Sequence, residues 1–207
     1  MARIIAAMPI RRLILVVLLL GALIAAGCGK SSSSSNSSSS TTAAAGALSG
    51  EAKSAATGDI PDNQVFLTFK NPGGGYAMRY PEGWAQRGSG RDVTFQDKNN
   101  VVHVVVAPGS APTSSSVAAQ LAKLRTATPS LRANAPRPVT LHGTPVVKVT
   151  YTTVSSPNSV TGKRVKLTVD RYELARNGKI ATVDLGTPVG VDNVDAYRMM
   201  IESFRWM

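Results

Sequence analysis

The chain has 207 residues, 23 Lys and Arg against 12 Asp and Glu, and a formal net charge of +11. Its one cysteine, Cys28, excludes an internal disulfide framework and a cysteine-rich zinc site. The two histidines, His103 and His142, stand too far apart to form a short metal-ligand motif. The positive side chains are scattered rather than grouped in a basic block, so the charge does not predict nucleic-acid binding.

The N-terminus has the pattern of an export signal. Arg3, Arg11 and Arg12 precede Leu13–Ala26, a charge-free apolar run of 14 residues. This is the length of the hydrophobic region of a signal peptide, whereas a spanning helix needs about 20 such residues. We therefore expect the segment to direct export by the general secretory route and then to be cleaved off. The Arg pair leaves the twin-arginine route as the alternative.

The only cysteine ends this apolar run. Ala25, Ala26 and Gly27 precede Cys28, and the stretch resembles the lipobox of bacterial lipoproteins, which usually has Leu where Ala25 stands. The resemblance implies that these three small residues are recognised by the lipoprotein signal peptidase. The Cys28 thiol then carries diacylglycerol, and its freed amine carries a further acyl chain such as palmitate. Two or more chains hold a protein firmly on a membrane. The alternatives are an ordinary cleaved signal and a retained anchor.

The lipidated cysteine opens a segment, residues 28–58, that is rich in Ser, Thr, Ala and Gly. Such a composition cannot bury enough apolar surface to offset the entropy of ordering, so we expect a disordered tether. Signal peptide 1–27, tether 28–58 and domain 59–207 are the predicted organisation. The mature chain would lose only Arg3, Arg11 and Arg12 among charged residues, which leaves a net charge of +8.

The domain begins with β-type patterns. The runs Val65–Phe69 and Tyr76–Tyr80 predict strands, and the large groups of the second run fall on one face. Val93–Asp97 and Val101–Pro108 flank a turn and predict a hairpin.

A helix is expected next, and its serines are expected to cap it, with Val117, Leu121 and Leu124 on one face and Pro129 beyond its end. Three strands then follow, and Asn177-Gly178 joins the last two as a two-residue hairpin turn. These strands are Val146–Ser155, Val165–Arg176 and Lys179–Thr187.

A final helix over about 192–204 closes the predicted domain. Asp192 is its expected cap, and Val194, Tyr197, Ile201 and Phe204 form its expected apolar stripe. Together the elements predict an α+β fold, an antiparallel β-sheet packed with helices.

Four stretches carry a resemblance to the PsbP-like superfamily, which includes bacterial DcrB-like lipoproteins. They are Gly73–Trp84, Val93–Asp97, Val101–Pro108 and Ile201–Trp206. The resemblance covers about residues 65–206 and implies an α/β/α sandwich. It also implies a mostly noncatalytic binding or assembly role. No metal or partner residue of the photosynthetic members matches this chain, so none is carried over.

Few side chains qualify as candidate site residues. Tyr80 and Trp84 could form a binding surface, although burial of such aromatics in a core is the more frequent outcome. His103, inside a valine-rich strand, is expected to be a hydrogen-bonded histidine rather than a ligand or base, and His142 a turn residue. Asp170 and Glu173 should point to opposite faces of a strand, at solvated positions.

No catalytic residue, cofactor or metal site is predicted, and an enzyme is not expected, since no nucleophile motif occurs in the domain. We expect an extracytoplasmic lipoprotein on the bacterial cell membrane, whose domain binds or scaffolds by docking on another envelope component. A small-molecule or lipid-binding lipoprotein is the alternative, and a hydrolase of envelope polymers is the third hypothesis.

Overall fold

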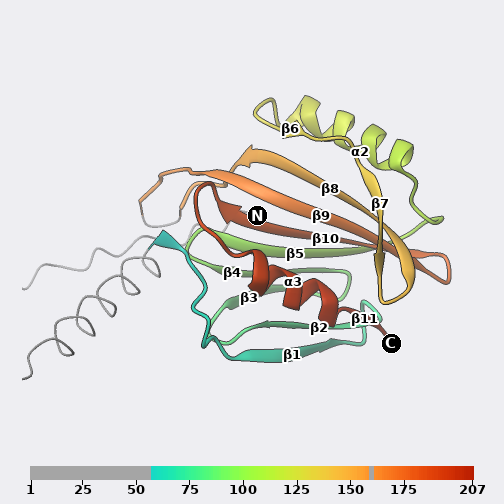
Figure 1. The fold of residues 1–207 in the computed structure, drawn as a ribbon, viewed down its shortest axis with the longest axis horizontal. Helices are drawn as coiled ribbons and strands as arrows, with labels where there is room; N and C mark the ends of the chain where they lie inside the picture. Colours follow the sequence, from blue (N-terminus) through green and yellow to red (C-terminus); the bar gives the residue numbers. More distant parts are fainter. Residues whose placement is uncertain (1–56, 159–160) are drawn as a thin grey trace, which may run out of the picture. The chain divides into compact units, whose positions relative to one another are not determined.

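A computed structural model describes residues 57–158 and 161–207 of the chain. Signal peptide 1–27, Cys28 and almost all of the expected tether lie outside the described residues. The described part contains two antiparallel sheets together with the helices α2 and α3 (Figure 1). This confirms the prediction of antiparallel strands packed with helices.

The smaller sheet has three strands in the order β1-β2-β11. They are β1 (Phe66–Asn71), β2 (Tyr76–Pro81) and β11 (Arg205–Trp206). Tyr76 and Met78 are both almost fully buried, as the alternation of β2 predicts. The C-terminal strand β11 therefore pairs with a strand near the start of the domain.

The larger sheet contains the remaining strands. They are β3 (Ala85–Ser89), β4 (Asp92–Asp97), β5 (Asn100–Pro108), β6 (Arg132–Ala133), β7 (Arg137–Leu141), β8 (Thr144–Val154), β9 (Lys166–Arg176) and β10 (Lys179–Pro188). Their order is β3-β4-β5-β10-β9-β8-β6, with β7 also paired to β8. Strand β5 thus lies beside β10, which comes much later in the chain.

The turns of this sheet follow the predicted turn chemistry. Asn177 and Gly178 have φ angles of 50° and 73°, the left-handed pair that a type I′ hairpin turn requires. His142, at φ 51°, stands in the turn between β7 and β8, as predicted. Glycine adopts such angles without the steric cost that other residues pay.

Helix α2 (Ser114–Ala127) packs on one face of the larger sheet, which we call the α2 face. Val117 and Leu121 are buried there among side chains of β8 and β9, as the helical spacing predicts. The cap is Thr113 rather than a serine. Its hydroxyl accepts from the Ser116 amide, while the Ser116 hydroxyl accepts from the Thr113 amide, and this capping box starts the helix.

Helix α3 (Val194–Ser203) and the smaller sheet pack on the opposite face, the α3 face. Tyr197, Met200 and Ile201 are its buried residues. The predicted stripe was wrong at Val194, which is 68% exposed. Val194 is the first helical residue, and the packed face is set by the later turns. The cap position is Asn193, one residue after the predicted Asp192, but the Asn193 side chain makes no capping bond. The Asp192 carboxylate accepts from the Val194 amide at 3.2 Å, so Asp192 supplies the hydrogen bond at the start of the helix.

Candidate functional site

A row of polar side chains crosses the α2 face of the larger sheet. Register pairs join Arg87 on β3 to Thr94, Thr94 to His103 on β5, and His103 to Asp184 on β10. Asp184 is in turn paired with Arg171 on β9. Register partners in antiparallel strands place their side chains on the same face, so this row faces the side that α2 covers only over β8 and β9.

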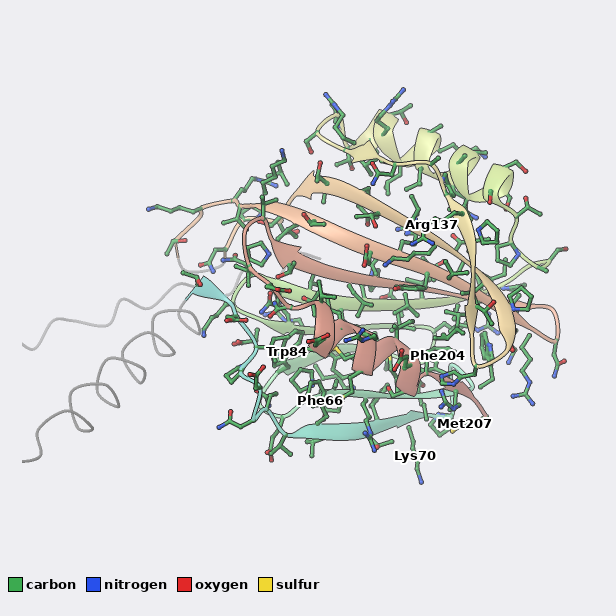
Figure 2. All side chains as sticks on the ribbon, in the orientation of Figure 1. Phe66, Lys70, Trp84, Arg137, Phe204 and Met207 are labelled. Atoms are coloured by element: carbon green, nitrogen blue, oxygen red, sulfur yellow. The ribbon has the colours of Figure 1, made fainter. Side chains whose placement is uncertain are left out.

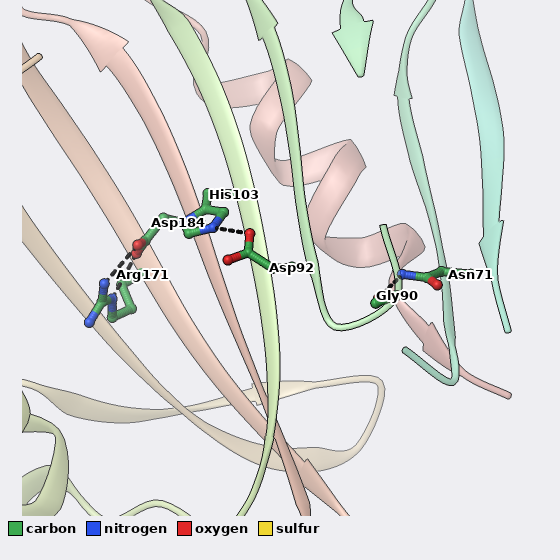
Figure 3. A network of polar contacts seen from close by, with 6 residues as sticks. All are labelled: Asn71, Gly90, Asp92, His103, Arg171 and Asp184. Carbon is green, nitrogen blue, oxygen red and sulfur yellow. Dashed lines mark hydrogen bonds and ion pairs between the residues drawn. The ribbon is translucent and has the colours of Figure 1, made fainter. Parts of the chain in front are cut away.

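The buried end of the row is an ion pair. Arg171 Nε and Nη2 each donate to one oxygen of Asp184, both at 2.7 Å, and the two side chains are only 12% and 13% exposed (Figure 3). Burial alone would lower the pKa of Arg171, but the hydrogen bonds to Asp184 raise it above its ordinary value. The guanidinium also lies 5.5 Å from the centre of the Tyr151 ring.

The open end of the row holds the second contact. His103 Nε2 lies 2.8 Å from Asp92 Oδ1, and these side chains are 37% and 71% exposed (Figure 3). His103 is therefore hydrogen-bonded, as predicted. However, its partner is a carboxylate on the neighbouring strand β4, and the pair faces solvent on the α2 face.

Glu173 extends this polar system beneath α2. It was predicted at a solvated position, and that prediction was wrong, since Glu173 is 0% exposed. Oε2 accepts a long hydrogen bond of 3.4 Å from Gln120 of α2, and Oε1 has no hydrogen-bond partner within the described residues. Burial raises the pKa of Glu173 above its ordinary range. The helix crossing above β9 is the physical reason that this carboxyl is removed from water.

A groove of about 700 Å³ opens on the α2 face beside this row. One wall comes from β3, β4 and β5, and the other comes from the end of β8 and the segment 155–158 that follows it. His103 and Asp184 contribute to its surface. A volume of this size falls within the range of small-ligand sites.

Two smaller hollows lie elsewhere on the described surface. One, of about 440 Å³, gathers Asp59, Asp62, Asp192 and Asp195 around the start of α3. The other, of about 310 Å³, lies among β7–β9 and β11. Asp195 is paired with Arg198 one helical turn later.

The aromatic residues considered as a binding surface lie elsewhere. Trp84 is 8% exposed and belongs to the core on the α3 face (Figure 2). Tyr80 is half-buried, and its ring stacks on Phe95 with 4.4 Å between ring centres. Both contribute to packing, and neither lines the groove.

In residues 57–158 and 161–207, no group of three or more His, Cys, Asp or Glu side chains could hold a metal ion. In the same ranges, no helix has the length and apolar character needed to cross a membrane. The lipidation residue Cys28 and the peptidase-recognition residues Ala25, Ala26 and Gly27 lie outside the described part.

Strand pairing explains why the polar row was missed from the sequence. The contact between His103 and Asp92 requires that β4 and β5 form a hairpin, which was predicted, and that both side chains face away from the α3 side. The alternation of buried valines in β5 is the signal that could have shown this, because Val102 and Val104 leave His103 on the opposite face. Nothing local links His103 to Asp184, since β10 lies far along the chain.

Comparisons with known proteins support the fold. No family model and no curated protein sequence matches the chain. The solution structure of cyanobacterial PsbP (CyanoP) from Synechocystis sp. PCC 6803 is similar, with a TM-score of 0.53 and 17% identity over 72% of this chain and 98% of that one. The described domain therefore has a PsbP-like fold.

Weaker similarities accompany it. The Ran-binding protein Mog1p of Saccharomyces cerevisiae has a TM-score of 0.45 and 11% identity, over 70% of this chain and 96% of that one. A Bacteroides thetaiotaomicron protein has a TM-score of 0.44 and 14% identity, over 68% of this chain and 48% of that one.

Proposed function

We propose that the protein is an extracytoplasmic lipoprotein, anchored through Cys28, whose PsbP-like domain binds a component of the cell envelope without catalysing a reaction. The observation that carries the binding role is the open half of the α2 face, where the groove lies beside the polar row. Because α2 covers only the β8–β9 side, the strands β3–β5 present hydrogen-bonding side chains to solvent.

The packing of the domain supports binding at this surface rather than inside the fold. The core on the α3 face is filled by aliphatic and aromatic side chains, with Tyr76, Phe95 and Met200 fully buried. A lipid-binding domain would be expected to enclose an apolar cavity between sheet and helix. The groove instead has walls with many polar groups, which favours a polar component over a lipid chain.

The anchor rests on the sequence around Cys28 and is tested separately. Wild type and Cys28→Ala are expressed in a bacterial host with an alkyne-labelled fatty acid, and the membranes are fractionated. Label and membrane retention are expected to be lost in Cys28→Ala. The variant Ala25→Leu, which restores the usual lipobox residue, is expected to be labelled at least as well as the wild type. An unlabelled wild type would contradict the anchor.

The contact between His103 and Asp92 favours a hydrolase as the second candidate. A histidine beside a carboxylate in a groove is the arrangement of a general base. Among the described residues no hydroxyl group is hydrogen-bonded to His103, so a nucleophile is not in place. Release of soluble fragments from purified cell wall by the wild type, and not by His103→Gln, would support this candidate.

A further inference from the structure

The groove on the α2 face carries charged side chains of both signs. Its charged lining residues are Arg87, Lys98, Asp97 and Asp184, two of each sign. Asp184 is already paired with Arg171. Apart from that pair, Arg87 and Lys98 are offset only by Asp97, so the groove has a weak rather than a strong electrostatic preference for a polyanion.

The walls of the groove carry neutral groups that both donate and accept hydrogen bonds. Thr94 and Gln96 come from β4 on one side, while Thr153, Ser155 and Ser156 come from the end of β8 on the other. Hydroxyl and amide groups match ligand hydroxyls, which also donate and accept. The Ser155 hydroxyl already donates to the Ser156 carbonyl and accepts from the Val165 amide. The hydroxyls of Thr94 and Thr153 are the groups that a hydrocarbon chain would remove from water without new partners, which is unfavourable.

The floor of the groove is apolar and mostly buried, since Leu167 and Val169 are only 5% and 3% exposed while Val101 is half-buried. Val101, Leu167 and Val169 line the groove. Gly186 stands between Val101 and Val169 in the register, and a Cβ atom there would lie 2.8 Å from Val101 Cγ1. The missing side chain lets the two valines pack beside each other, so apolar groups lie between two polar walls.

From this arrangement we propose that the groove binds a neutral carbohydrate chain of a few sugar units. A sugar ring has an apolar C–H face and a rim of hydroxyls. The hydroxyls match the polar walls, and the C–H face can lie over Val101, the half-buried residue of the apolar floor. The volume of about 700 Å³ suits a short oligosaccharide. This inference deepens the proposed function, because it names the chemical class of the envelope component and rests on the same surface.

The test uses the full chain, purified in a detergent without a sugar headgroup. It is applied to an array of neutral hexose and N-acetylhexosamine tri- to pentasaccharides, with heparin-derived oligosaccharides as anionic probes. Binding to a neutral oligosaccharide is expected, and calorimetry then gives the dissociation constant. Thr94→Val and Thr153→Val each remove one wall hydroxyl with little change of shape. Each is expected to weaken binding about five-fold, the effect of one hydrogen bond.

Thr168→Val is the matched control. Thr168 lies on β9 between Leu167 and Val169, and strand alternation points it to the α3 face, so its binding should equal that of the wild type. The inference is overturned if no neutral oligosaccharide binds, if the anionic probes bind better, or if Thr94→Val and Thr153→Val bind like the control. The array does not depend on the anchor. Carbohydrate binding by an unlabelled wild type would therefore uphold the inference while the anchor fails.

Discussion

His103 and Asp184 stand directly opposite each other on β5 and β10, yet each is bonded to a different partner on its far side. His103 contacts Asp92 on β4, and Asp184 holds Arg171 on β9 (Figure 3). The row therefore contains two separate pairs, one exposed and one buried. This difference in burial predicts very different energies for two similar carboxylates.

Asp184→Asn is expected to lower the free energy of unfolding by about 3–5 kcal/mol. The substitution leaves the Arg171 charge buried without its counter-ion, and such breaks are costly. Asp92→Asn is the matched control, and its cost should stay below about 1 kcal/mol because Asp92 is 71% exposed. Urea denaturation at pH 7 measures both. Equal losses in the two variants would contradict the division into a buried and an exposed pair.

The burial of individual side chains shows how much of this fold can be predicted from the sequence alone. Local signals were sufficient for the turn at Asn177-Gly178, for the packed face of α2 at Val117 and Leu121, and for the alternation of β2. Burial that depends on a distant element was not predictable. The sequence predicts an exposed charge at Glu173, because nothing local shows that α2 covers this part of β9. It predicts a buried side chain at Val194, because the way α3 lies on the sheet is not encoded in the helix alone.

Glu173 should make the domain less stable as the pH rises. Burial raises its pKa in the folded state above the unfolded value, so the folded state binds more protons between the two. Stability is therefore fully present below the unfolded pKa and declines as the pH rises through the folded one. Glu173→Gln is expected to remove this component of the pH dependence. At neutral pH it should raise the free energy of unfolding by about 1 kcal/mol, because no charge is then buried.

Urea denaturation of the wild type and Glu173→Gln at a series of pH values from acid to neutral measures the difference. Glu82→Gln, at an exposed position, is the control and should follow the wild type. A Glu173→Gln variant that loses stability at neutral pH would show that the carboxylate has a required partner.

Asn193 fastens the start of the domain to the region where α3 begins. Its Oδ1 accepts from the Ile60 amide at 2.8 Å, and its Nδ2 donates to the Gly58 carbonyl at 3.1 Å. Nδ2 also lies within hydrogen-bonding distance of Asn100 and Thr187, and Asn193 is 3% exposed. The side chain therefore joins residues that are far apart in the sequence.

Asn193→Ala leaves several of these buried groups without partners, so the free energy of unfolding should fall by about 3 kcal/mol. The amide of Ile60 should also exchange its hydrogen faster, because the segment around it opens locally. Hydrogen exchange and urea denaturation measure the two effects. Asn134→Ala, at an exposed position, should change neither. Unchanged exchange at Ile60 would show that packing alone holds the segment.

Substitutions at Trp84 test the stability of the domain separately from binding in the groove. Its side chain is 8% exposed in the core on the α3 face, so Trp84→Ala should cost about 3–5 kcal/mol, the usual loss for a large buried aromatic. Trp84→Phe keeps most of the buried ring surface and should cost less. Any carbohydrate affinity of Trp84→Phe should equal that of the wild type, because the indole does not line the groove. A folded Trp84→Phe variant that loses affinity as strongly as Thr94→Val would place the binding surface on the α3 face instead.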